Sequence, residues 1–177
     1  VHQKDRAVLD LFAGSASLAG AIGKQVNFVS NDIQEYSKVL SQTYLVSLRD
    51  SDIPDIDHIY QKTLSLVEAN GQKEYLVDYI NLTNIDDFNS LEESQKDLIN
   101  KEFLYDYHLF AKNYSGTWWS YEQCLWIDAL RQIADEYKNK QIYPIFLSSL
   151  MYAMAYCSQG TGHYAQYRDA KTNSSFN

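Results

Sequence analysis

The chain has 177 residues, of which 45% are apolar and 21% are charged, and its formal net charge is −8. These values are typical of one soluble globular domain that is long enough to bury a core. Residues 50–106 hold 14 Asp and Glu against 4 Lys, and duplex DNA attracts Lys and Arg instead. The composition therefore argues against a protein that binds nucleic acid through its overall charge.

The cysteines and the apolar segments favour a cytoplasmic protein. Cys124 and Cys157 lie in apolar, helix-like segments, which predicts free, buried thiols in a reducing compartment. The first residues lack the organisation of a signal peptide, and no apolar run approaches the roughly 18 residues of a membrane span. We expect no membrane partner.

The opening residues predict an α/β fold. Apolar runs at 6–12 (RAVLDLF) and 26–32 (VNFVSND) resemble parallel strands that are buried on both faces. Between them, 14–23 (GSASLAGAIG) is rich in small residues, which suits a helix packed closely on a sheet. Residues 33–48 have apolar positions at helical spacing. Strand, helix and strand in this order predict a right-handed βαβ unit.

Beyond residue 50 the patterns predict helices. Ser120 and Gln123 form a capping box at the start of one of them, and the most apolar one is expected to be buried and to end near Gly160. The predicted helices are 55–71, 90–114, 120–140 and 142–160. Two strands rarely form a stable sheet alone, so either 73–83 (KEYLVDYINLT) hides a strand or the chain is a piece of a larger protein, which we favour. We divide it into an N-terminal βαβ part, 1–49, and a predominantly helical region, 50–177.

The turn at 10–17 (DLFAGSAS) follows the first strand and could bind a phosphate. A nucleoside-triphosphate loop ends in Gly-Lys-Ser/Thr, whereas Gly14 is followed by Ser15, Ala16 and Ser17. A dinucleotide fingerprint has three glycines at G-x-G-x-x-G spacing, and this chain supplies only the first of them. Both phosphate interpretations are therefore disfavoured.

A nucleoside without its phosphates fits the turn better. Asp10 ends the first strand and could serve a charged amino group, while Asp32 ends the second and could accept both ribose hydroxyls. Their 22-residue spacing is close to the roughly 20 residues between turn and ribose acid in nucleotide-binding βαβ units. These features predict S-adenosylmethionine. A plain tight turn, with the aspartates capping helices, remains an equally open alternative.

At residues 7–48 and 115–168 the sequence resembles the DNA adenine-N6 methyltransferases, which carry a D-x-F-x-G-x-G turn and later a D-P-P-Y motif. The second segment has an aromatic-Ser start, an Ile-Asp-x-x-Arg helix and an apolar helix leading to a Gly-containing turn. The resemblance implies a partial Rossmann-like methyltransferase fold with a large helical insertion, in an enzyme of DNA methylation or restriction-modification. It implies that Asp32 holds the ribose of S-adenosylmethionine and that Ile33 flanks the adenine. The implied cofactor loop is Asp10, Phe12, Ala13, Gly14, Ser15 and Ala16.

The sequence departs from the family pattern in two places. Ala16 replaces the second glycine of the turn, and no D-P-P-Y or N-P-P-Y occurs, since the prolines are Pro54 and Pro144. In the family this tetrapeptide binds the adenine amine and stacks on the flipped base. We therefore expect a fragment without catalytic residues, inactive in isolation. Its parent enzyme would act on duplex DNA, which this acidic chain alone is not expected to bind strongly.

Two other classes of function remain open. One is a non-catalytic Rossmann-like module that binds a protein partner, and the other is a class I methyltransferase acting on RNA or a small molecule. His58 and His108 lack metal-site spacing. Trp118 and Trp119 are expected to pack in a core more than to stack on bases, and residues 159–169 (QGTGHYAQYRD) to form a helix end and a solvated loop more than a ligand contact.

Overall fold

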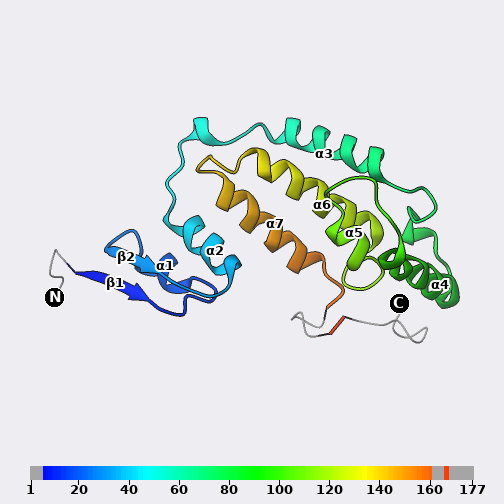
Figure 1. Ribbon diagram of the computed structural model, residues 1–177, viewed down its shortest axis with the longest axis horizontal. Coiled ribbons are helices and arrows are strands. Elements are labelled where there is room, and N and C mark those ends of the chain that lie inside the picture. The colour runs from blue at the N-terminus through cyan, green and yellow to red at the C-terminus, as the bar shows by residue number, and fades with distance from the viewer. Residues whose placement is uncertain (1–5, 161–165, 168–177) are drawn as a thin grey trace. The chain divides into compact units, whose positions relative to one another are not determined.

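The computed structural model describes residues 6–160 together with Gln166 and Tyr167 (Figure 1). These residues form two compact units. One combines residues 6–54 with Ala134–Tyr152, and the other combines Asp55–Ile133 with the described residues from Ala153 onward. None of the helices described is both long and apolar enough to cross a membrane.

The first unit begins with the predicted strand–helix–strand order. Val8 and Phe28, on neighbouring strands, are half-buried on one face of a parallel sheet in which Ala7 pairs with Asn27 and Asp10 with Ser30. The unit's opening elements are β1 (Ala7–Asp10), α1 (Ser17–Ile22), β2 (Asn27–Ser30) and α2 (Glu35–Leu45), followed by the short η1 (Asp50–Asp52). The expectation of mixed helix and strand with parallel pairing is confirmed.

The sheet has two strands within the described residues and is covered on one face. Leu9 is 56% exposed, and Val29 beside it is also exposed. Parallel strands are normally buried on both faces, so this apolar face is the kind of surface that further elements cover in complete α/β sheets.

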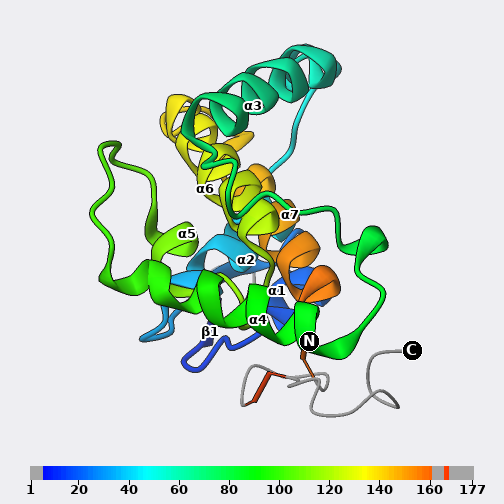
Figure 2. The same ribbon diagram turned by 90° about the vertical axis from the view of Figure 1, so that its right-hand side faces the viewer.

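The second unit is helical, and α3 (Ile56–Asn70) lies along α6 (Tyr121–Glu136) (Figures 1 and 2). Asp55 caps α3 by accepting hydrogen bonds from the backbone N–H groups of Asp57 and His58. The aromatic rings of Tyr60 and Trp126 stack with centroids 5.7 Å apart, which joins the two helices.

The predicted helix over 90–114 is wrong in its extent. The chain forms α4 (Ile85–Lys96), η3 (Asp97–Asn100), a loop that projects from the unit (Figure 2), and α5 (Leu109–Asn113). Phe103 and Tyr105 in the loop pack against the core, so their apolar character reflects loop anchoring and not a helical face. The hidden strand suggested at 73–83 is also absent, because this segment forms turns and η2 (Tyr79–Asn81).

The capping box of α6 is confirmed. Gln123 N–H donates to Ser120 Oγ (3.2 Å), and Ser120 N–H donates to Gln123 Oε1 (3.0 Å). The helix carries much of the core, including the fully buried Tyr121, Cys124 and Leu125. Trp119 is buried as well, as expected of a core residue, and its Nε1–H donates to the Met154 carbonyl.

The apolar helix α7 (Tyr143–Cys157) is less buried than predicted. Leu150 is buried, but Tyr152, Tyr156 and Cys157 are exposed. The expectation of two buried thiols is therefore wrong for Cys157 and confirmed for Cys124. The sequence of an apolar helix does not show which of its faces packs against another element. On α7 the described residues leave the side chains of Tyr152, Tyr156 and Cys157 exposed.

Candidate functional site

Two loops meet at the carboxyl ends of β1 and β2. The backbone N–H of Asn31 donates to the Asp10 carbonyl (2.8 Å), and the Ala13 N–H donates to the Asn31 carbonyl (3.0 Å). These bonds extend the parallel pairing beyond the strands and hold residues 11–16 beside residues 31–34. The carboxyl edge of a parallel sheet is where α/β proteins bind ligands, and it is where the sequence-predicted site residues come together.

The first loop requires two left-handed backbone conformations, at Gly14 (φ +51°) and Ala16 (φ +59°). A Cβ atom at Gly14 would make only an ordinary contact, 4.0 Å from the Phe12 carbonyl oxygen, so glycine serves the backbone conformation there and not a close approach. Ala16 is 0% exposed, and its N–H donates to the Ala13 carbonyl (2.7 Å). Its methyl group therefore packs inside the protein, away from the open side of the loop.

Asp32 joins the two loops through its side chain. Its Oδ2 accepts the Gly14 N–H (2.8 Å), and its Oδ1 accepts the Gln34 N–H (2.9 Å). These backbone hydrogen bonds, that from Gly14 first, lower the pKa of the Asp32 carboxyl below its usual value. An ionised carboxylate has about four lone-pair positions, so each oxygen retains capacity for a ligand hydroxyl.

Each of the two loops exposes a large apolar side chain. Phe12 is 88% exposed and Ile33 is 98% exposed. Asp10 is half-buried at the end of β1, and Ser15 Oγ lies 2.7 Å from Ser17 Oγ where α1 begins. The two loops thus combine exposed apolar side chains with an ordered carboxylate, and a nucleoside has both apolar and hydrogen-bonding surface to match them.

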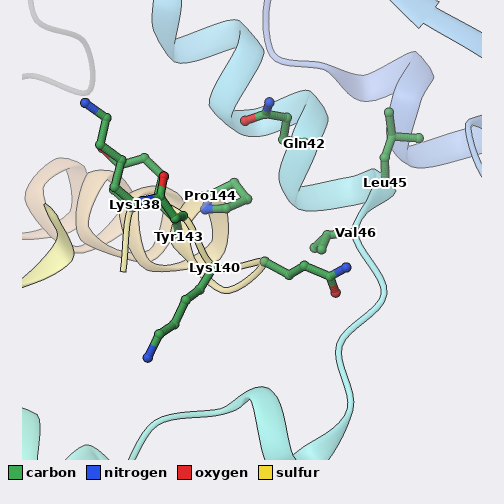
Figure 3. A pocket seen from close by; sticks show the side chains of 9 residues that line it. Gln42, Leu45, Val46, Lys138, Lys140, Tyr143 and Pro144 are labelled. Atoms are coloured by element: carbon green, nitrogen blue, oxygen red, sulfur yellow. The ribbon is translucent and has the colours of Figure 1, made fainter. Parts of the chain in front are cut away.

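A separate hollow of about 520 Å³ lies where α2 ends and α7 begins. Its lining includes Gln42, Lys138, Lys140 and Tyr143, and Figure 3 shows the two lysine side chains pointing away from one another. The hollow and the Asp32 loop stand at opposite ends of α2, whose 11 residues span roughly 16 Å. Diverging cations do not make a cradle for a phosphate, so we assign no binding role to this hollow.

The aspartate of the Ile-Asp-x-x-Arg segment has a structural role. Asp128 is buried, and its carboxylate accepts the N–H groups of Phe110 (3.0 Å) and Ala111 (2.8 Å), which caps α5 from α6. Within the described ranges no three His, Cys, Asp or Glu side chains gather as metal ligands. Of the C-terminal candidates, Gly162, His163, Tyr164 and Arg168 lie outside the described residues.

Sequence reasoning missed Asn31. Its side-chain amide Nδ2 donates to the Leu11 carbonyl (3.0 Å), so it bonds the neighbouring loop through both side chain and backbone. The feature of the sequence that could have indicated it is an asparagine directly before Asp32, at the end of the predicted second strand. Its partner could be named only after the two loops were placed side by side.

The family comparison covers the whole chain. The model of the D12 class N6 adenine-specific DNA methyltransferases matches residues 1–177. Searches of curated proteins and of solved structures gave no match.

Proposed function

We propose that this chain, which belongs to the D12 class N6 adenine-specific DNA methyltransferase family, carries an S-adenosylmethionine site but not the residues that activate the adenine amine. The main support is the Asp32 carboxylate, which is bonded to Gly14 of the neighbouring loop at the carboxyl edge of the parallel strands. That arrangement orders an acceptor for ribose hydroxyls before any ligand arrives.

The residues of the two loops suit the parts of this cofactor. The free lone pairs of Asp32 would take the ribose hydroxyls, and Phe12 and Ile33 would cover the adenine with exposed apolar surface. Asp10 would attract the charged amino group. The left-handed Gly14 leaves the open side of the loop without a side chain. The cofactor, when bound, supplies an electrophilic methyl group.

Methyl transfer needs a second set of groups that these 177 residues lack. An exocyclic adenine amine is a poor nucleophile because its lone pair is delocalised into the ring, and no D-P-P-Y is present to bind it. We propose that this polypeptide is inactive alone and that the acceptor-side residues belong to a longer parent protein with a complete Rossmann-like sheet. The exposed apolar face of the sheet around Leu9 supports this proposal, because further elements would cover such a face in a complete sheet.

In the same proposal residues 1–49 form the N-terminal βαβ part and residues 50–177 the predominantly helical, target-side region. The acidic stretch 50–106 opposes strong binding of DNA by this chain alone. A non-catalytic binding module is the second candidate, favoured by the missing tetrapeptide and by the exposed Tyr152 and Tyr156 on α7. A methyltransferase for RNA or small molecules has less support, because the matching family acts on DNA adenine.

Calorimetric titration with S-adenosylmethionine tests the pocket. We expect Asp32→Ala to raise the Kd at least about tenfold, since a hydrogen bond to a charged group contributes about 1.5–3 kcal/mol. Asp50→Ala, at an exposed aspartate of η1 in the same unit, is the matched control and should bind like wild type. Equal binding by wild type and Asp32→Ala would remove Asp32 from the site.

An assay of methyl transfer to duplex DNA tests the proposed inactivity. With labelled S-adenosylmethionine and this polypeptide alone, no label should enter adenine. Detectable methylation of adenine would show that the chain holds its own catalytic groups and would overturn this part of the proposal.

A further inference from the structure

We propose that Asn31 is a positioning residue that sets the conformation of the loop after β1, and through it the affinity for the cofactor. The identity of that cofactor rests on the proposed function above. The geometric part of the proposal rests only on the contacts between the two loops, so it can be tested without any ligand.

Asn31 and Asp32 together bond four backbone groups of the first loop. Asn31 N–H and Nδ2 donate to the carbonyls of Asp10 (2.8 Å) and Leu11 (3.0 Å), and its own carbonyl accepts the Ala13 N–H (3.0 Å). Asp32 then accepts the Gly14 N–H (2.8 Å). The contacts run in register along the loop, two on each side of residue 12.

The residue between these contacts is the one that a ligand would meet. Phe12 is 88% exposed, and its neighbours Leu11 and Ala13 are each bonded by Asn31. An exposed loop loses backbone entropy when it is ordered. Ala13 and Ala16 are buried, whereas Leu11 and Phe12 are exposed, so at these two exposed residues the order comes from hydrogen bonds to the backbone. Fixing both neighbours of Phe12 restricts the directions that its ring can take. Asn31 thus acts on the ligand surface without being part of it.

The chemistry of the contact requires an amide. The Leu11 carbonyl accepts and needs a donor, and asparagine supplies one at Nδ2. An aspartate at this position has the same shape but only acceptors when ionised, and it would add a negative charge beside Asp32. The loop should therefore be most stable with asparagine at position 31, less stable with alanine and least stable with aspartate.

Hydrogen exchange of the cofactor-free protein tests the geometry. Asn31→Ala should speed exchange of the Ala13 and Gly14 amides about two- to tenfold, the range expected for one weak hydrogen bond, with α2 amides unchanged. Asn31→Asp should speed it further. Asn27→Ala, an exposed asparagine at the other end of β2, is the control and should leave both amides unchanged. Unchanged exchange in Asn31→Ala would overturn the proposal.

A double-mutant cycle tests the link to the cofactor. S-adenosylmethionine is titrated against wild type, Asn31→Ala, Asp32→Asn and the double variant. If both residues act through one loop conformation, the double variant loses less affinity than the product of the single losses. Losses that multiply would mean that Asn31 makes a separate contact and would overturn the positioning role.

The experiments distinguish the binding of S-adenosylmethionine from the positioning role of Asn31. If wild type does not bind S-adenosylmethionine, the proposed function and the affinity role of Asn31 both fall, while the exchange rates still decide whether Asn31 orders the loop. If wild type binds and Asn31→Ala binds equally well, the proposed function stands and the role of Asn31 is rejected.

Discussion

The loops at the carboxyl ends of β1 and β2 differ from the helical unit in how they are held. The first loop buries only two alanine side chains, and hydrogen bonds from Asn31 and Asp32 join it to the second loop. The helical unit is held by a packed apolar core around Tyr121 and Leu125. Because separate groups support the two regions, stability and ligand binding should respond to different substitutions.

In the helical unit, one buried amide has its polar atoms bonded to other protein groups. Gln95 is buried, and its Oε1 accepts from Tyr79 Oη (3.0 Å) and from the Tyr121 N–H (3.1 Å), while its Nε2 donates to the Tyr75 carbonyl (3.2 Å). Burial raises the pKa of Tyr79 to about 12, so its hydroxyl remains a donor at neutral pH. At Asp32, by contrast, the polar groups keep acceptor capacity that solvent can reach. Gln95 therefore belongs to a structural network, whereas Asp32 can still accept further hydrogen bonds.

The largest effect is expected in the helical core. Leu125→Ala should lower the free energy of unfolding by about 2–5 kcal/mol, because a buried leucine is replaced by a cavity. Urea denaturation followed by circular dichroism measures it. Leu104→Ala removes a side chain that is 100% exposed and is the matched control, with a change within about 0.5 kcal/mol. Equal losses in the two variants would contradict the assignment of the core.

Acidification should affect the loops in a defined direction. The pKa of Asp32 is lower in the folded protein than its ordinary value of 3.8. The stabilisation of its ionised form is therefore complete above that value and is lost as pH falls through the lower, folded-state pKa. The Gly14 amide resonance, followed by NMR, should be constant from neutral pH down to about 5 and should move only below about 4. A titration midpoint of the Gly14 resonance above about pH 5 would contradict the hydrogen bonds that Asp32 accepts.

The smallest effect is expected at Ala16. Ala16→Gly removes the strain of a left-handed alanine, about 1–2 kcal/mol, but also loses a buried methyl group of about 0.8 kcal/mol and adds chain entropy to the unfolded state. The free energy of unfolding should change by less than about 1 kcal/mol. Thermal denaturation checks this, and a larger loss would mean that the methyl group fills space that the loop needs.

Local patterns were enough to predict the βαβ opening and the start of α6. The apolar runs and the small residues between them marked the parallel strands, and Ser120 with Gln123 marked the start of α6. The roles of Asp10, Gly14 and Asp32 remain predictions, although the structure brings them to one edge.

What the sequence concealed depends on contacts between distant segments. Phe103 and Tyr105 have helical spacing to their neighbours but pack as loop anchors. Tyr156 belongs to an apolar helix, yet no periodicity tells which side of it is covered. The amide of Asn31 had no identifiable partner until the carbonyl of Leu11 was placed beside it.

The central claim is that the cofactor binds the loops and not the helical unit. Adding S-adenosylmethionine to the isotope-labelled chain and recording the backbone amide spectrum tests it most directly. We predict that the Gly14 and Asp32 resonances shift in a saturable way while those of the core residues Leu125 and Ala129 do not. A spectrum unchanged at saturating cofactor, or shifts confined to the helical unit, would contradict the account.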